Sequence, residues 1–387
     1  MPRTGLRALA SVALLLVGTQ LPAAPTADER LNVLWQRAEA QLSLEKSLEA
    51  LQTARRAVRL APRSADAWAL LSLVTFETAC DLDFTTRDIA NTANRAARCG
   101  NSSKVWLVIG LCNCFCGPET EQGMDCLRHS LRLNPRYARA RAMLGEALWD
   151  ARRGVEAIAE MREAVRLEPD SSRWHLSLCR MLGELSRLDE ALVENDLAVR
   201  WAATNLQLSY AHRERAWLRA YQGQWPEAVE EARLGCALLP DDLEKTIRAA
   251  AAAARGDRDW PIDNWRLMRA QATFGAILAL NGDFARAERA LEGAWADWEG
   301  GFASPARAYV LAQLDRPDEA GRHLPFQKSW REYPQSLREV YFLARAYRAL
   351  GDAPRARAAC EVGLRHWPEH PFRTQLRALL AELPAPQ

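Results

Sequence analysis

A period of 34 residues is the feature that most constrains how this chain of 387 residues can fold. Pro135 and Pro169 are separated by one such period, and the segment between them carries Leu144-Gly145, Ala157 and Ala164. Elsewhere apolar residues recur at three- and four-residue spacing with few β-branched runs, which is typical of helices. Because a fixed period of roughly 20 to 50 residues marks a repeat architecture, the sequence predicts a stack of helical units.

Each recurring residue has a physical role in a helix hairpin. A small residue such as Gly145 allows two helices to approach closely, and Ala157 and Ala164 allow the same approach from the facing helix. A closing proline has no N–H and ends the second helix. A Leu-Gly pair early, alanines in the second helix and a closing proline together resemble the tetratricopeptide repeat. The resemblance implies an all-α, right-handed superhelical solenoid.

The same register recurs over residues 31–383 and predicts about nine hairpins followed by a capping helix at 372–383. The second, third and eighth units depart from the pattern, so their helix boundaries are less well defined by it. We expect an N-terminal array over residues 27–240, a joint with an extra helix over 241–267, and a C-terminal array with its cap over 268–387.

The N-terminus predicts export. Arg3 and Arg7 precede a mostly apolar run over residues 9–18, and small residues follow at 21–24, as in a secretory signal peptide spanning residues 1–23. The apolar run is roughly half the length that a membrane span requires. We therefore expect a soluble mature protein that is periplasmic or secreted.

The charge balance argues against nucleic acid as a partner. Lys plus Arg total 51 and Asp plus Glu total 49, and removal of a leader with Arg3 and Arg7 makes the two equal. A neutral chain has no overall attraction for nucleic acid or for an anionic membrane.

The sequence offers no catalytic motif. His366 and His370 are four residues apart, but Pro368 lies between them and the glutamate of a zinc-protease helix is missing. The chain contains neither a P-loop nor a GxSxG nucleophile elbow. We expect a protein that is not an enzyme and that holds no metal and no cofactor.

A cluster of cysteines is open to three interpretations. Cys112, Cys114 and Cys116 lie within five residues, with Cys80 and Cys99 before them and Cys126 after them. In an oxidising compartment such cysteines more often form disulfides; the candidates are Cys80, Cys99, Cys112, Cys116 and Cys126, and a bond from Cys126 to Cys112 or Cys116 is the natural first choice. Inert thiols are the second interpretation, and a thiol or metal site at residues 112–116 is the third.

The family resemblance also implies a concave groove, lined by the first helix of each hairpin, that holds a peptide or a partner domain. Arginine and aromatic residues favour tight contacts in such interfaces, although long arginines also simply cover helix surfaces. The groove positions are Trp149, Arg173, Arg180, Tyr210, Arg213, Trp217, Arg338, Tyr341, Arg345 and Arg348.

We therefore expect a non-catalytic adaptor of the bacterial cell envelope whose groove binds another protein. Two alternatives stay open. One is the binding of a glycan or cell-wall fragment through groove aromatics, and the other is thiol or metal chemistry at Cys112–Cys116.

Overall fold

The structure, a computed structural model, describes residues 26–82, 84–117, 120–239, 265–292, 303–324 and 336–384. The predicted signal peptide and residues 241–264 of the predicted joint lie outside these ranges.

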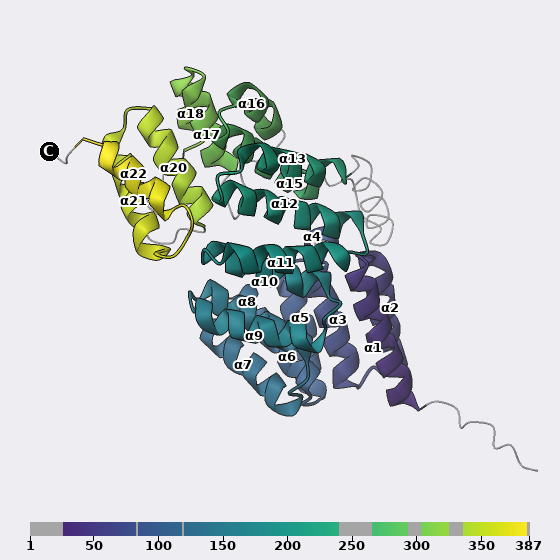
Figure 1. Cartoon of the computed structure of the whole chain (residues 1–387). Helices are drawn as coiled ribbons and strands as arrows, with labels where there is room; N and C mark the ends of the chain where they lie inside the picture. The colour runs from purple at the N-terminus through teal and green to yellow at the C-terminus, as the bar shows by residue number, and fades with distance from the viewer. Residues whose placement is uncertain are drawn as a thin grey trace, which may run out of the picture.

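The described helices pack as consecutive pairs that stack into a curved array (Figure 1). The short α4 (Ala79–Leu82) follows α3, and α22 (Arg373–Glu382) packs on α21 at the C-terminal end. The all-α solenoid with its C-terminal capping helix is confirmed. The pairs are α1 (Ala27–Ser43) with α2 (Ser47–Leu60), α3 (Ala65–Glu77) with α5 (Thr86–Cys99), α6 (Ser103–Phe115) with α7 (Thr120–Leu133), α8 (Ala138–Asp150) with α9 (Gly154–Leu167), α10 (Ser172–Glu184) with α11 (Leu188–Arg200), α12 (Asn205–Tyr221) with α13 (Trp225–Ala237), α15 (Trp265–Leu280) with α16 (Phe284–Glu292), α17 (Ala303–Gln313) with α18 (Pro317–Arg322), and α20 (Leu337–Ala349) with α21 (Ala353–His366).

Small residues allow the two helices of a hairpin to approach each other closely, as the sequence pattern predicted. A Cβ atom built on Gly145 would lie 3.1 Å from the carbonyl oxygen of Ala157 on the facing helix. Ala157 and Ala164 are fully buried. A larger side chain at these positions would force the two helices apart, which explains the glycine and alanines of the repeat.

The turn inside several hairpins uses a residue with positive φ. Three of these residues are glycines, which adopt this conformation without strain, whereas Glu45, Arg152, Ser186 and Asp315 adopt it with a side chain. Arg152 and Ser186 each contact the same C-terminal segment: Arg152 lies 4.2 Å from the ring centroid of Trp367, and the Ser186 hydroxyl donates to the Glu369 carbonyl oxygen. Two strained turns thus face the turn that follows α21.

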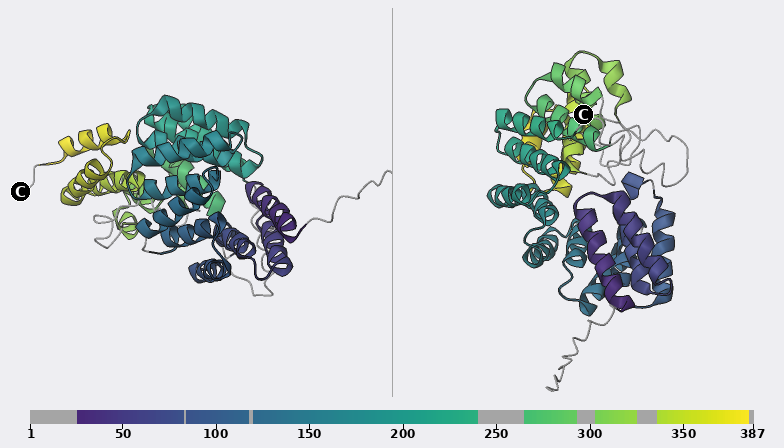
Figure 2. Two further views of the ribbon diagram at one scale, coloured as in Figure 1. Left: turned by 90° about the horizontal axis from the view of Figure 1, so that it is seen from below. Right: turned by 90° about the vertical axis from the view of Figure 1, so that its right-hand side faces the viewer.

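The solenoid closes on itself at several points. Helices α20–α22 lie beside α10–α12 in two directions of view (Figures 1 and 2). On the other side, the Gln207 amide in α12 donates to the Ser43 carbonyl oxygen at the end of α1 over 2.6 Å. The concave side is therefore partly occupied by the chain itself.

Candidate functional site

A pocket of about 680 Å³ lies on the concave side of the N-terminal half. Its walls come from the turn between α1 and α2, the end of α3, helices α8, α10 and α12, the turns that precede α10 and α12, and one residue of α15. Four of the predicted groove residues line it: Arg173, Arg180, Tyr210 and Arg213. The pocket thus brings together four of the ten residues that the sequence predicted for the groove.

Glu77, at the end of α3, is buried in the pocket wall and binds two arginines. It accepts from Arg139 Nη1 and from Arg173 Nη1, each at 2.7 Å, and Arg139 Nε also donates to Glu39 at 3.3 Å. Burial alone would raise the pKa of Glu77, but Arg173 and Arg139 lower it below its usual value. This charged carboxylate ties α3 to α8 and α10 across two hairpins.

Arg180, on α10, also lines the pocket and is also paired. It donates to Glu146 Oε2 at 2.6 Å, and its guanidinium carbon is 5.9 Å from the centroid of the Trp149 ring. Burial, followed by the charge of Glu146, raises the pKa of the neighbouring Asp150 to about 6. The predicted groove residue Trp149 therefore contacts Arg180 but does not line the pocket.

Arg213 differs from the other arginines of the wall. Its side chain is 7 % exposed, and its guanidinium carbon lies 5.2 Å from the centroid of the Tyr210 ring. Within the described ranges, its buried Nε and Nη1 atoms have no hydrogen-bond partner. Burial, followed by the positive charge of Arg269, lowers the pKa of Arg213 to about 10. The pocket thus contains a buried cation whose donors are unsatisfied.

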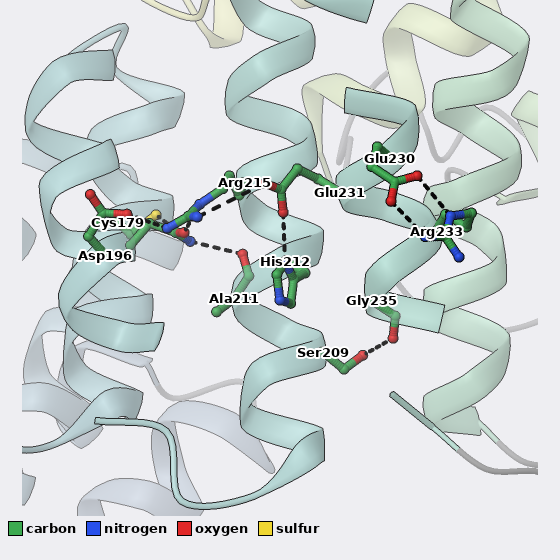
Figure 3. Close-up of polar contacts among 11 residues, drawn as sticks. Cys179, Asp196, Ser209, Ala211, His212, Arg215, Glu230, Glu231, Arg233 and Gly235 are labelled. Carbon is green, nitrogen blue, oxygen red and sulfur yellow. Dashed lines mark hydrogen bonds and ion pairs between the residues drawn. The ribbon is translucent and has the colours of Figure 1, made fainter. Parts of the chain in front are cut away.

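The other faces of α12 hold it between its neighbours (Figure 3). Ser209 donates to the Gly235 carbonyl oxygen at 2.6 Å, and His212 Nδ1 lies 2.6 Å from Glu231 Oε2. The preceding hairpin repeats both contacts: Ser172 donates to the Ala198 carbonyl oxygen at 2.7 Å, and His175 Nδ1 lies 2.6 Å from Glu194 Oε2. The recurring Ser-x-x-His is visible in the sequence, and our sequence reasoning missed it.

The remaining concave face of α12 is covered by the turn after α21. Trp217 is 1 % exposed and meets the Phe372 ring edge-on at a centroid separation of 6.4 Å. Tyr341, 5 % exposed, stacks on Phe372 with the centroids 4.4 Å apart. These two residues face the interior, so the structure corrects their predicted place on an open groove.

Arg338 links α20 to this contact. Its guanidinium donates to the Tyr221 hydroxyl at 2.9 Å and to Glu214 Oε2 at 3.2 Å, and lies 4.4 Å from the centroid of the Trp217 ring. Arg338 is therefore an internal ion-pair partner, which also departs from its predicted role.

The last two predicted groove residues belong to the C-terminal hairpins. Arg345 donates to the hydroxyls of Tyr341 at 3.0 Å and Tyr309 at 2.7 Å, and Arg348 pairs with Glu382 on α22. Both lie outside the pocket. Conversely, sequence reasoning missed Glu77, Trp174 and Arg269 as pocket residues. Glu77 ends α3, and Trp174 is off the repeat positions that the family pattern assigns to the groove, whereas Arg269 occupies such a position and was overlooked.

The cysteine cluster lies on the α6–α7 hairpin, and the eight cysteines whose side chains the structure describes are all free thiols. Cys114 points at α7: its thiol donates to the Thr120 carbonyl oxygen at 3.6 Å, and a Cβ on Gly123 would lie 2.4 Å from its sulfur. Burial, then the nearby Cys126, raises the pKa of Cys114 to about 12. The charge of Cys126 thus acts on Cys114, whereas the sequence favoured Cys112 or Cys116 as the disulfide partner of Cys126.

The high pKa values do not favour a reactive thiol at this cluster. Burial also raises the pKa of Cys112, and it raises that of Cys116 to about 11; the thiolate is the reactive form. Among the residues that the structure describes, no three His, Cys, Asp or Glu side chains gather as a metal site requires. In the same ranges, no helix is long and apolar enough to cross a membrane.

The fold is similar to that of two solved structures. In the crystal structure of the APC/C hetero-tetramer Cut9-Hcn1, the matched chain is 13 % identical, with 87 % of this chain and 55 % of that chain covered and a TM-score of 0.58. A Rap protein complexed with competence and sporulation factor is 11 % identical, with coverages of 92 % and 100 % and a TM-score of 0.58. This chain thus spans about half of the length of the first structure and the whole of the second.

No family model matches the chain, and no curated protein matches it either. At such low identities the likeness to the solved structures is one of fold. The chain is an all-helical solenoid similar in fold to tetratricopeptide-repeat proteins.

Proposed function

We propose that this protein is a non-catalytic scaffold that binds a segment of another protein in the pocket between α3, α8, α10 and α12. The observation that carries the proposal is the pocket itself, which is built from helices of successive hairpins and holds a buried cation without a hydrogen-bond partner among the described residues.

The rigidity of the wall supports this proposal. Glu77 fixes the arginines of α8 and α10, and the Trp174 indole donates to Glu168 at 2.7 Å. Such paired side chains lose little further conformational entropy when a partner binds. A glycan is less favoured, because Trp174 is 2 % exposed and Arg213 lies over the Tyr210 ring, which leaves Trp201, 41 % exposed, as the one open aromatic ring among the lining residues.

Site-specific photocrosslinking in cells tests the proposal. A photoreactive phenylalanine derivative at Leu176, in the pocket wall, should give a discrete set of protein adducts. The matched control carries the same photoreactive derivative in place of Val155, which is 84 % exposed and lies outside the pocket. Equal adducts at both positions, or none at Leu176, would contradict the proposal.

We also propose that the protein is exported and works in the cell envelope. The support is the leader-like sequence at residues 1–23, with Arg3 and Arg7 ahead of an apolar run.

The intact mass of the protein purified from cells under non-reducing conditions checks both expectations. We expect a chain that begins at Ala24 and is lighter by two hydrogens for each disulfide, with the bonded cysteines identified by peptide mapping. Thiol blocking before lysis controls for oxidation during purification. A full-length, fully reduced chain would show that the export proposal and the disulfide prediction are both wrong.

A further inference from the structure

The near-neutral charge of the whole chain conceals a strongly basic edge on its first three hairpins. This edge consists of residues 51–64, 91–102 and 126–137, which form the C-terminal parts of α2, α5 and α7 and the turns after them. The three segments carry four, two and three arginines, respectively, and no lysine, aspartate or glutamate. These arginines are exposed, except for the half-buried Arg128, which pairs with Asp125. None of them lines the pocket.

Side-chain contacts place the three segments of the basic edge in one row. The Trp68 indole of α3 donates to the Pro62 carbonyl oxygen at 2.9 Å, and the Arg95 guanidinium carbon lies 5.1 Å from the centroid of the Trp68 ring. Trp106 of α6 repeats this arrangement: its indole donates to the turn after α5, and its ring centroid lies 4.4 Å from that of His129 on α7. Each tryptophan thus joins the turn after one second helix to the second helix of the next hairpin. These hairpins, coloured purple to blue, lie together in Figure 1.

Few acidic groups neutralise the basic edge. Within the described ranges, none of the four arginines of residues 51–64 forms an ion pair. The acidic residues at the adjoining starts of the first helices are Asp28 and Glu29 in α1 and Asp66 in α3, and Asp66 is already paired with Lys104 at 3.1 Å. Helices α6 and α8 begin without an acidic residue. The edge therefore keeps a positive charge.

The helix dipole explains only part of this charge. A basic residue in the last turn of a helix is favourable because it faces the negative end of the dipole, and α2, α5 and α7 each have one arginine there. Arg63 and Arg136 instead follow the closing prolines of the first and third hairpins, beyond the helix ends. The same position of the fourth hairpin is occupied by Asp170. The turn itself thus does not require an arginine.

Two exposed leucines lie among the arginines of the basic edge. Leu60 is 39 % exposed and Leu133 is 50 % exposed, and they are the last residues of α2 and α7. Each is preceded directly by an arginine and followed, three residues later, by Arg63 or Arg136. Such a mixture suits an anionic bilayer surface, because guanidinium groups bind lipid phosphates while apolar side chains enter the boundary between head groups and acyl chains.

We propose that the basic edge binds the surface of a bilayer that contains anionic phospholipid. The binding would be peripheral, through the tips of three neighbouring hairpins. It does not depend on the proposed pocket, because the two surfaces share no arginine.

Other anionic partners fit the basic edge less well. A single-stranded nucleic acid needs open aromatic rings for its bases, whereas Trp68 and Trp106 are covered by Arg95 and His129. A second copy of this chain offers an acidic surface, because α9 and α11 carry more acidic than basic residues. Protein interfaces, however, deplete charged residues from their buried centre, and here arginines flank both leucines.

Flotation of the full chain with lipid vesicles tests the proposal. Vesicles of phosphatidylcholine and phosphatidylglycerol in equal parts are compared with vesicles of phosphatidylcholine alone. Arg63→Asp combined with Arg136→Asp gives these turns the residue of the fourth hairpin. Arg365→Asp combined with Arg377→Asp is the matched control, because it changes the net charge equally on exposed arginines of α21 and α22. All proteins have the same N-terminus, so the leader-like segment contributes equally.

We expect the parent to bind the vesicles that contain phosphatidylglycerol, and to bind them more weakly as salt is added. Because each arginine near an anionic surface strengthens binding about fivefold, the Arg63→Asp, Arg136→Asp variant should bind roughly 30-fold more weakly or worse. The control should bind like the parent. Leu60→Ser combined with Leu133→Ser should also weaken binding, since it removes the apolar contact with the bilayer.

Urea unfolding of each variant separates lost binding from lost folding, and the midpoints should match that of the parent because the changed side chains are exposed. Equal binding by the parent and by the Arg63→Asp, Arg136→Asp variant overturns the proposal, as does equal binding to both kinds of vesicle. A parent that ignores vesicles but forms oligomers, which the same variant abolishes in analytical ultracentrifugation, also overturns it and assigns the edge to a second copy. Crosslinking at Leu176 reports on the pocket independently of these results.

Discussion

Lowering the pH from 7 to 5 should weaken the folded state by about 2 kcal/mol through one imidazole, that of His370. This side chain is 3 % exposed, and its Nδ1 accepts from the Phe372 N–H at 3.1 Å. Burial, with a smaller contribution from the Arg338 charge, lowers the pKa of His370 to about 3. The imidazole is therefore neutral in the folded protein throughout this pH range.

The sign follows from proton binding. Below the unfolded pKa of about 6.5 the unfolded chain binds a proton that the folded protein does not, so stability falls by about 1.4 kcal/mol per pH unit until the folded pKa near 3 is reached. Protonation at Nδ1 would also break the bond from Phe372. The loss of stability should therefore appear first as a loosening of the contact between α12 and the turn after α21.

Urea unfolding of the parent and of His370→Asn across pH 4.5–7 measures this effect. The Asn side-chain oxygen can accept from the Phe372 N–H in place of Nδ1 but does not titrate, so the difference between the two proteins isolates His370 from other groups. Parallel pH profiles would show that the imidazole is protonated inside the fold.

Truncation of Trp217 to Ala should cost about 3–5 kcal/mol of unfolding free energy, the range for removing a large buried aromatic side chain. Trp217 is 1 % exposed and packs against Tyr221, Phe372 and the guanidinium of Arg338. The cavity left by the indole would lie where α12, α20 and the turn after α21 meet. A residue that only contacted a partner in an open groove would show no such loss.

The matched control is Trp201→Ala. Trp201 lines the pocket and is 41 % exposed, so its truncation should change the unfolding free energy by less than about 1 kcal/mol. Urea unfolding with constant m-values compares the two variants. A similarly small decrease in unfolding free energy for both variants would show that Trp217 is a surface residue, as its repeat position predicted.

The hairpin architecture could be predicted because its determinants are local. Gly145, Ala157 and the closing prolines act within one unit, and the same marks recur from unit to unit. The capping helix after α21 was predictable for the same reason. The positive φ at Ser186 and Arg152 occurs at the same repeat position as that of Gly223, Gly282 and Gly351, so the register marks the turn although neither residue is a glycine.

The site could be predicted only in part, because it depends on how far the solenoid curves. Arg213 and Trp217 are one helical turn apart on α12 and both occupy positions that the family pattern assigns to the groove, yet one faces the pocket and the other faces Phe372. The ion pair of Arg338 with Glu214 joins residues 124 apart. The direction of Cys114 toward α7 likewise depends on the close approach at Gly123. No periodicity encodes such contacts.

The bonds from Gln207 to Ser43 and from Ser186 to Glu369 join residues 164 and 183 positions apart. In a linear repeat array each unit touches only its neighbours, so the end units fray independently and the chain can be shortened from either end. Here the first and the last hairpin each form a hydrogen bond with a hairpin in the middle of the array. Backbone amides in the terminal helices should consequently exchange with solvent nearly as slowly as those of α10 and α12, and removal of the last hairpin should loosen the centre of the molecule.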